Sequence, residues 1–375
     1  MKVGIITILK VNNYGAELQA YATQVAINKL GAKAEIIDYL FYKHPKHVKT
    51  NLSRPLFKFS RKKRLVEFLY PLITKVKEFG SKETKKRISR FEKFHEINTA
   101  QSHTFYKLDE LYSDCPDYDV YLVGSDQVWN PGIYSSLKPY FLDFAPKEKR
   151  KVAYASSFGI GALPENVKET YRYYLSSFDA LGVREKSGVK IISDLRLKAE
   201  NVLDPTLLLN GDDWRKVSSQ YDGLPIRYVA VYELTPSSYL REVSKTISKL
   251  LGCPIVRICK SAKADEKNVI NITDAGPAEF LSIMQNAEFV VTNSFHGTAF
   301  SINFQKPFFT ITPNRKDNNS RQTNLLVLLG IENRILKERD SIPSDISLDF
   351  SNVKERLEEE RVKSIKFLTM AIYGK

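Results

Sequence analysis

The sequence predicts an α/β protein of two Rossmann-like domains that face a central cleft, with a basic helical insertion in the first domain. At 375 residues the chain exceeds the size at which one hydrophobic core usually stops growing, so two domains are expected. Hydrophobic residues make up 43% of the chain and aromatic residues 11%, which is enough for two cores. Strand-like runs alternate with helical patterns in both halves, as in parallel sheets with right-handed helical connections.

Each half contributes its own set of predicted elements. In the first half the strands are 2–9, 34–40, 120–123, 151–156 and 180–183, with a helix over 16–30. In the second half the strands are 228–232, 254–258, 268–272, 288–292 and 307–312, with helices over 238–251 and 277–286. Glycine and proline punctuate the region between Pro205 and Pro225, which predicts domains over 1–210 and 211–375. A last helix over 353–370 could pack back on the first domain.

The predicted insertion, at about 43–98, carries almost all of the formal charge of +14, since residues 43–95 hold 17 Lys and Arg against four Glu. Helical patterns cover 65–79 and 84–97, and the first is amphipathic with a basic rim. Such a surface could attract an anionic membrane or a lipid-linked acceptor, and a solvated helical hairpin would give the same pattern. No nucleic-acid motif accompanies the charge, so nucleic acid is not an expected partner.

Several classes of protein are not indicated. The longest apolar runs are far shorter than a membrane span and no cleavage site follows Met1, so the protein is expected to be cytoplasmic, with a possible location at the inner face of the membrane. The three cysteines form no C-x-x-C pair. No His-Glu-x-x-His motif occurs, and we expect no metal or cofactor.

A histidine follows the predicted strand 288–292. That strand ends at Thr292-Asn293-Ser294, whose side-chain oxygens can cap a helix. His296 should therefore lie at a strand-to-helix corner, on the sheet edge where α/β proteins bind ligands and where helix N–H groups attract anions. His296 could hold an anion and move a proton there, although a packed histidine is the commoner outcome for this local pattern.

Polar residues also follow strands of the first half. Asn13-Tyr14-Gly15 comes after the first strand, where glycine lets a ligand approach the backbone. Ser125-Asp126 follows 120–123 and could bind sugar hydroxyls or form an ordinary capped turn. Arg184 follows 180–183 and could grip a carboxylate or phosphate, or form a surface ion pair. Trp129 could stack on a sugar or pack.

Taken in order, these motifs resemble the polysaccharide pyruvyl transferase family, from Asn12 to about Gly330 outside the insertion. The order of the segments is specific, although no single one is. The segments are NNYGAELQA at 12–20, GSDQVWN at 124–130, VREKS at 183–187, VLDPT at 202–206 and TNSFHGT at 292–298.

The resemblance implies a GT-B-like fold and a pyruvyl transferase that moves pyruvate from phosphoenolpyruvate onto a sugar of a polysaccharide precursor as a cyclic ketal. His296 would be the general acid. The acceptor would be a lipid-linked or nucleotide-linked saccharide. The expected donor-binding residues are Arg184, Ser294, Gly297, Arg315 and Arg321, and the expected acceptor-binding residues are Asn13, Tyr14, Gly15, Ser125, Asp126 and Trp129.

One position departs from the family pattern. Family members commonly carry arginine two residues before the histidine, where this chain has Ser294. Arg315 and Arg321 follow the next strand and are the nearest replacements for that charge. Two other functions remain open: a GT-B-type nucleotide-sugar glycosyltransferase, which the fold alone cannot separate from a pyruvyl transferase, and a membrane- or partner-binding module built on the basic insertion.

Overall fold

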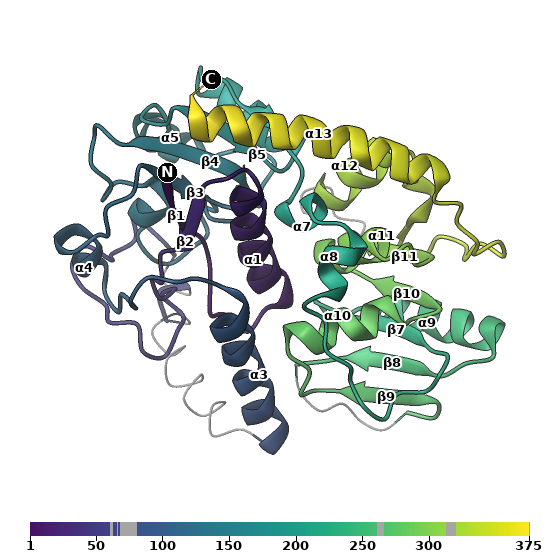
Figure 1. Ribbon diagram of the computed structural model, residues 1–375. Helices are drawn as coiled ribbons and strands as arrows, with labels where there is room; N and C mark the ends of the chain where they lie inside the picture. Colours follow the sequence, from purple (N-terminus) through teal and green to yellow (C-terminus); the bar gives the residue numbers. More distant parts are fainter. Residues whose placement is uncertain (61–62, 66, 68–80, 261–265, 313–319, 375) are drawn as a thin grey trace. The chain divides into compact units, whose positions relative to one another are not determined.

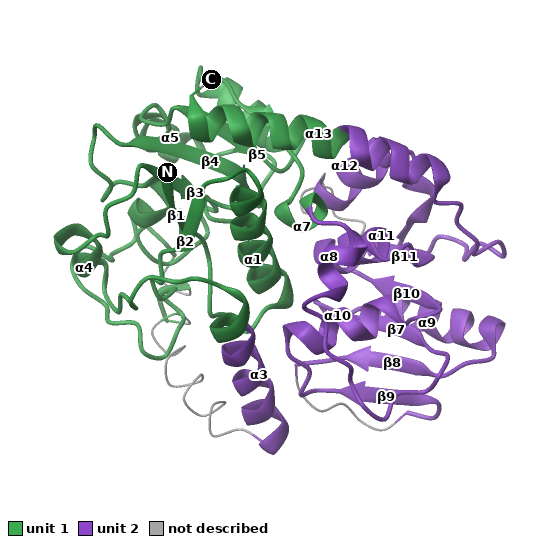
Figure 2. Cartoon of the chain, in the orientation of Figure 1, with its two compact units in different colours: residues 1–80, 95–208, 360–375 green, residues 81–94, 209–359 purple. Residues whose placement is uncertain are grey.

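The computed structural model describes residues 1–60, 63–65, 67, 81–260, 266–312 and 320–374. The chain divides into two compact units, which Figure 2 colours separately. Unit 1 comprises residues 1–80, 95–208 and 360–375, and unit 2 comprises residues 81–94 and 209–359. Each unit contains a six-stranded sheet with helices packed on it (Figure 1), which confirms the predicted α/β class with two Rossmann-like domains.

The sheet of unit 1 has the strand order β2-β1-β3-β4-β5-β6, with every neighbouring pair parallel. The chain winds outward in both directions from β1, so the space beyond the carboxyl ends of β1 and β3 is where a doubly wound sheet offers a ligand site. The strands are β1 (Lys2–Ile6), β2 (Lys33–Ile36), β3 (Val120–Val123), β4 (Arg150–Ser156), β5 (Ala180–Val183) and β6 (Glu200–Asn201).

Helices cover both faces of this sheet because both faces are apolar. The helix α1 (Tyr14–Lys29) and the end of α13 (Ser351–Tyr373) pack on one face through Ala20, Ile27 and Leu368. The helices α4 (Leu108–Ser113), α5 (Glu165–Leu175) and α6 (Lys186–Asp194) pack on the other. The short helices η1 (Lys138–Phe141) and α7 (Pro205–Leu208) complete the unit.

The sheet of unit 2 has the order β12-β11-β10-β7-β8-β9, again all parallel, with its winding reversed between β7 and β10. Its strands are β7 (Val229–Tyr232), β8 (Ile255–Ile258), β9 (Val269–Ile272), β10 (Phe289–Thr292), β11 (Phe308–Thr312) and β12 (Ile335–Lys337). Its helices are α8 (Gly211–Arg215), α9 (Ser238–Leu251), α10 (Pro277–Gln285), α11 (Phe295–Asn303), α12 (Ser320–Leu329) and η2 (Glu332–Arg334).

Within the predicted insertion, the second helix is present as α3 (Lys82–Asn98). Most of the first predicted helix, 65–79, lies outside the described residues. Residues 82–94 of α3 belong to unit 2, where Arg87 donates hydrogen bonds to the carbonyls of Lys260 and Thr273. The basic segment is therefore not uniform, since part of it is bonded to the sheet edge of unit 2.

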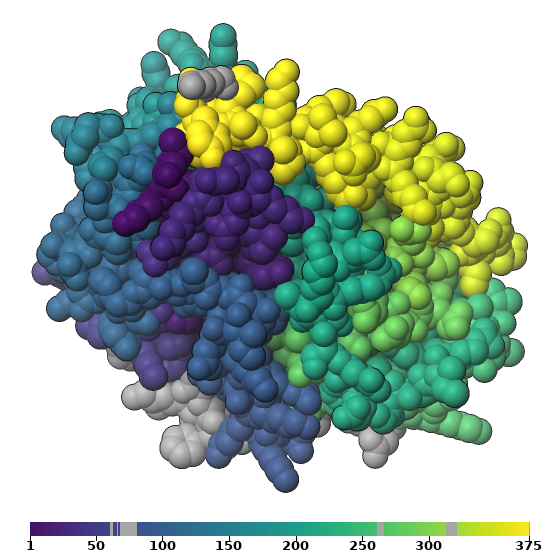
Figure 3. Space-filling model, in the orientation of Figure 1, coloured from purple at the N-terminus to yellow at the C-terminus, as the bar shows by residue number. Residues whose placement is uncertain are grey.

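The C-terminal helix α13 ends in unit 1, where its residues 360–375 are counted. Leu203 N donates to Ser364 Oγ at 2.9 Å, and Tyr373 donates to the carbonyl of Leu30 at 2.8 Å. The outer face of the helix, coloured yellow in Figure 3, remains exposed and includes Val362. Across the described residues, no helix has the length and apolar character needed to cross a bilayer.

Candidate active site

The histidine predicted at a corner of unit 2 lies in the first turn of α11, two residues after the helix cap. Ser294 is the N-cap, and its Oγ accepts a hydrogen bond from Gly297 N at 3.4 Å. Thr292 Oγ1 accepts from Ser294 N at 3.0 Å and donates to the carbonyl of Tyr232. His296 is 8% exposed. The imidazole therefore lies in the first turn of a helix, on the edge of the sheet where winding reverses.

Glycine at position 297 is required by the tight junction between β10 and α11. A Cβ at this position would lie 2.3 Å from Thr292 Oγ1, much closer than real Cβ contacts. The helix can therefore begin directly against the strand that precedes it. This close approach fixes where the first turn, with His296, sits on the sheet edge.

Neighbouring elements hold the loop before His296 in place. Asn293 Oδ1 accepts from Leu234 N at 2.7 Å, and Asn293 Nδ2 donates to the carbonyl of Thr235, so the ends of β7 and β10 are joined. From α12, Gln322 Nε2 donates to the carbonyl of Asn293 at 3.3 Å. The buried Gln322 Oε1 accepts no hydrogen bond from the described residues.

Of the two arginines predicted to replace the family arginine, one lies within the described residues. Arg321 lies half-buried in α12, one residue before Gln322. Arg315 lies outside the described residues. Ser294, His296 and Gly297 share a single helical turn, as the order of the sequence motif requires.

On the edge of unit 1, the first motif forms the start of α1. Asn13 is the N-cap, and its Oδ1 accepts from Gly15 N at 3.0 Å. Tyr14 and Gly15 are buried in the first turn. Asn13 therefore lies at the carboxyl end of β1, on the sheet edge that it shares with the second motif after β3.

The second motif is built into a buried polar network. Ser125 N donates to Gln19 Oε1 at 2.9 Å, and Ser125 Oγ donates to Asp204 Oδ2 at 3.1 Å. Thr7 Oγ1 donates to the carbonyl of Ser125 at 3.1 Å. Ser125 is fully buried, whereas the side chain of its neighbour Asp126 is 20% exposed. Of these two residues, Asp126 is the one that presents a carboxylate at the edge.

Arg184 is the centre of this network. Its NH1 donates to Asp204 Oδ2 at 2.7 Å, and its NH2 and Nε lie 3.7 Å and 3.9 Å from carboxylate oxygens of Asp126 and Glu185. Burial alone would lower the pKa of the guanidinium, but the three carboxylates raise that pKa above its ordinary value. With its side chain 1% exposed, Arg184 holds the edge of unit 1 together from within.

Trp129 has the packing role rather than a place on the surface. Its ring is fully buried between Phe158 and Phe178, with centroids at 5.3 and 5.9 Å, and its Nε1 donates to the carbonyl of Tyr140. A sugar would have to displace core residues to reach it. Trp129 instead supports the loop that follows Asp126.

Two structural residues of the edge were not among the predicted site residues. Asp204 accepts hydrogen bonds from Arg184 NH1, from Ser125 Oγ and from the N–H and hydroxyl of Thr206. It therefore joins the motifs at 124–130, 183–187 and 202–206. An aspartate inside the apolar run Val202-Leu203-Asp204-Pro205 was a signal that it is buried and paired. Gln19, inside the first motif, gave no comparable signal, because its partner is more than a hundred residues away.

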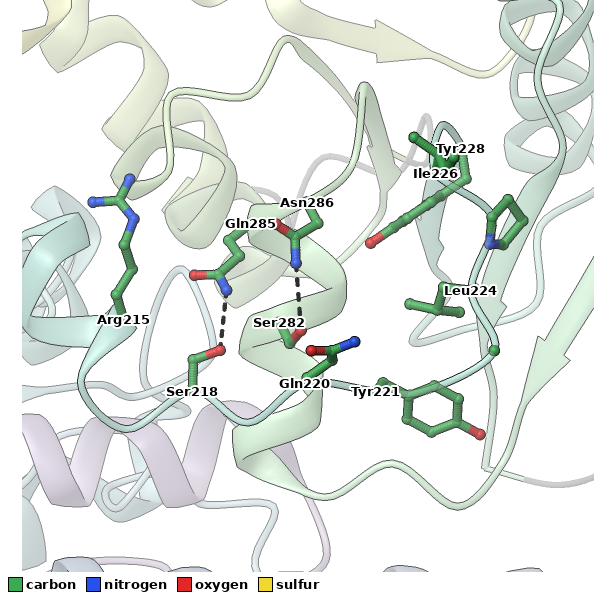
Figure 4. A pocket seen from close by; sticks show the side chains of 12 residues that line it. Arg215, Ser218, Gln220, Tyr221, Leu224, Ile226, Tyr228, Ser282, Gln285 and Asn286 are labelled. Atoms are coloured by element: carbon green, nitrogen blue, oxygen red, sulfur yellow. Dashed lines mark hydrogen bonds between the residues drawn. The ribbon is translucent and has the colours of Figure 1, made fainter.

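A hollow of about 530 Å³ lies elsewhere on unit 2 and is drawn in Figure 4. Tyr228 and Asn286, two of its lining residues, precede β7 and β10. It therefore lies at the amino ends of these strands, on the opposite edge from His296. In the described residues no cluster of His, Cys, Asp or Glu is arranged to hold a metal ion.

Two doubly wound domains in one chain are the architecture of GT-B proteins. Among solved structures, the UDP-GlcNAc 2-epimerase of Neisseria meningitidis bound to UDP-GlcNAc is similar over 100% of both chains, with 10% identity and a TM-score of 0.51. The S. aureus MnaA–UDP structure covers 96% of this chain and 87% of its own, with 9% identity and a TM-score of 0.50. At these identities the likeness shows the fold alone.

The family itself follows from the sequence. Residues 13–315 match the model of the family described as polysaccharide pyruvyl transferase. The chain belongs to the polysaccharide pyruvyl transferase family. Among curated proteins, none matches the chain in sequence.

Proposed function

We propose that this protein transfers the pyruvyl group of phosphoenolpyruvate to two hydroxyls of a sugar in a polysaccharide precursor and forms a cyclic ketal. The family match over residues 13–315 carries the proposal. It is supported by the position of His296 at the start of α11, beside helix N–H groups that suit an anion. The N-cap Ser294 and the tight junction at Gly297 keep that turn in one place.

The reaction balances with phosphoenolpyruvate as the sole donor. A proton adds to the methylene carbon and makes it a methyl group, which leaves the adjacent carbon electrophilic. One sugar hydroxyl attacks that carbon, phosphate leaves with its oxygen, and the second hydroxyl closes the ring. Of the two hydroxyl protons released, one replaces the proton consumed and the other leaves with the phosphate. His296 is the proposed acid for the first step.

Donor and acceptor have different proposed sites. On unit 2, the first turn of α11 with Ser294, His296 and Gly297 binds the donor, together with Arg321 and Arg315. On unit 1, Asp126 and Asn13 are the acceptor contacts at the edge, whereas Ser125, Tyr14 and Gly15 shape it from below. The buried Arg184 acts through the carboxylates of Asp126 and Asp204 and is therefore a positioning residue.

The acceptor is proposed to be a lipid-linked or nucleotide-linked saccharide, modified in the cytoplasm before export. The basic segment 43–95 supports a peripheral location at the inner face of the membrane, because Lys and Arg near an anionic surface are attracted to it.

Mass spectrometry tests the function directly. Saccharides carrying hydroxyl pairs that can close a five- or six-membered ring are incubated with the protein and phosphoenolpyruvate, and inorganic phosphate is measured in parallel. We expect a product heavier by pyruvic acid less one water, with one phosphate released for each product. In deuterated water the new methyl group should gain one deuterium. Thermal stabilisation by UDP- or GDP-sugars with none by phosphoenolpyruvate would instead indicate a glycosyltransferase.

A further inference from the structure

A basic hollow in unit 1 lies outside the groups assigned above. It has a volume of about 770 Å³, and its lining includes Tyr42, Lys49, Ser53, Arg54, Arg64 and Tyr134. Among the described residues that line it there is no aspartate or glutamate, although the lining Tyr42 and Thr50 donate hydrogen bonds to Glu67 and Asp109. A run of lysines and arginines such as segment 43–95 is often no more than a solvated surface. In this hollow, however, three cations of that segment line one concavity together with two tyrosines.

The hollow lies on the same sheet edge as the proposed acceptor residues. Tyr42 follows β2, and Tyr134 belongs to the loop that begins with Ser125-Asp126 after β3. Both segments leave the sheet at carboxyl ends of strands of unit 1, from β2 and β3, which flank β1 on either side. A ligand that touches Asp126 with one end can therefore extend toward this hollow along a single connected loop.

The walls of the hollow are fastened to the body of unit 1. The carbonyl of Ser53 accepts from Ser136 N at 3.0 Å and from Ser135 Oγ at 3.2 Å. Phe57 stacks on Tyr171 of α5, with ring centroids 5.7 Å apart. The segment that carries Arg54 thus has a fixed position relative to the loop after β3, as a binding site requires.

The three cations of the hollow are not used in holding the fold together. The side chains of Lys49, Arg54 and Arg64 are exposed, and none makes an ion pair or hydrogen bond with the described residues. Two other lysines of the basic segment do have partners: Lys43 lies 4.0 Å from Glu67, and Lys63 donates to the carbonyl of Gly132. The pKa of the nearby His47 is lowered to about 4, mainly by burial and secondly by the positive charge of Lys49. Three exposed cations in one concavity favour an anion.

We propose that this hollow binds the phosphate groups of the acceptor, so that the acceptor is a saccharide carrying a diphosphate. The inference rests on the proposed function. Guanidinium groups bind phosphate oxygens in pairs, and a lysine adds a third charge. Tyr42 and Tyr134 add aromatic surface to the same concavity, beside the place of the phosphates. A nucleotide-linked and a lipid-linked saccharide share this diphosphate.

The inference is tested by calorimetry, which measures the binding of four probes to the wild-type protein. The probes are UDP-GlcNAc, farnesyl-diphosphate-linked GlcNAc, benzyl-GlcNAc without phosphate, and vesicles of phosphatidylglycerol with phosphatidylcholine. At least one diphosphate sugar should bind about tenfold or more tightly than benzyl-GlcNAc, because charge-assisted hydrogen bonds are lost with the phosphates. Which of the two binds more tightly identifies the source of the diphosphate. Vesicle binding without binding of either sugar would overturn the inference in favour of a membrane surface.

Matched variants locate the effect. The double variant Arg54→Gln/Arg64→Gln should weaken diphosphate-sugar binding about tenfold or more. The control Lys82→Gln/Lys85→Gln removes the same charge from exposed positions of α3 and should change binding less than about twofold. Arg54→Lys/Arg64→Lys should recover part of the affinity. Equal weakening by both glutamine pairs would overturn the inference, since only net charge would then matter.

The proposed function and the inference fail separately. Phosphoenolpyruvate binding, measured by thermal shift, should be unchanged in Arg54→Gln/Arg64→Gln. Transfer from phosphoenolpyruvate at an unchanged acceptor KM in this variant would overturn the diphosphate site and leave the pyruvyl transfer standing. A protein that binds diphosphate sugars through these arginines but never releases phosphate from phosphoenolpyruvate would contradict the proposed function alone.

Discussion

At the residue scale, one imidazole carries the proton transfer of the proposed reaction. Replacing His296 by alanine should lower turnover about 100- to 10,000-fold, the range expected for loss of a general acid. The variant should remain folded, with only a modest loss of thermal stability, because the side chain is buried but lies at a sheet edge. Phosphate release from phosphoenolpyruvate measures the effect. The control is His103→Ala, on an exposed side chain, and a His296→Ala protein with full turnover would exclude the assignment.

Arg184 should affect stability before it affects binding. Replacing it by glutamine leaves Asp204 and Glu185 buried without their cation, which typically costs about 3–5 kcal/mol. Urea unfolding of Arg184→Gln should therefore show a large loss of the free energy of unfolding. Arg172→Gln, at an exposed position of α5, is the matched control and should be nearly neutral. Unchanged stability with weaker phosphoenolpyruvate binding would instead make Arg184 a donor contact.

At the scale of the element, the junction between β10 and α11 sets the geometry of the donor site. Gly297→Ala places a methyl group against Thr292, so the strand and helix must separate, at a cost of about 1–3 kcal/mol. Turnover should also fall, because the turn with His296 moves. Gly161→Ala is the control, since a Cβ there meets nothing within 4 Å. Equal melting temperatures for the two variants would show that the junction is not tight.

The first turns of α3 are attached to unit 2 by a titratable anchor. The carboxylate of Asp274 lies 2.8 Å from Lys86 Nζ and 3.2 Å from Arg90 NH1, and it accepts a hydrogen bond from the Tyr221 hydroxyl at 2.6 Å. Burial acts to raise the pKa of Asp274, but hydrogen bonds from Lys86 and Tyr221 and the charge of Arg90 hold that pKa below its ordinary value. Because the folded-state pKa is depressed, the carboxylate stabilises unit 2 above the ordinary pKa of about 4. This stabilisation is lost as pH falls through the folded-state pKa.

Asp274→Asn should therefore lower the free energy of unfolding by about 1–3 kcal/mol at pH 7. The difference from wild type should shrink as the pH falls below about 4, where the wild-type carboxyl is itself protonated. Chemical unfolding at a series of pH values measures this, with the exposed Lys85→Ala as control. A difference that is independent of pH over that range would contradict the anchor.

At the scale of the whole molecule, unit 1 is assembled from segments at both ends of the chain. Leu368 of α13 is fully buried with Val3 and Val152 in the core beneath the first sheet. Leu368→Ala should cost about 2–5 kcal/mol, whereas Val362→Ala, on the exposed face of the same helix, should cost less than about 0.5 kcal/mol. Hydrogen exchange should show the loss in β1 and β4. Loss confined to unit 2 would contradict the assignment of residues 360–375 to unit 1.

The sequence alone determined the elements with strong local patterns. β3, β5 and α9 begin and end where the pattern predicts, because an apolar run or a 3.6-residue period is a local property. It also placed His296 at its corner, since Ser294 caps a helix directly after an apolar strand. Short elements such as β6 and α7 were missed, because two or four residues are too few to show a period.

Tertiary structure decided which polar residues are structural. Arg184 and Ser125 are similar in sequence context to surface residues, yet contacts with Asp204 bury both. Trp129 is likewise placed by packing, in the core and not on a sugar. These outcomes depend on residues that lie tens of positions away in the chain, so no local pattern encodes them. The sequence supplied the chemistry of each edge, and the long-range contacts determined which groups reach solvent to perform it.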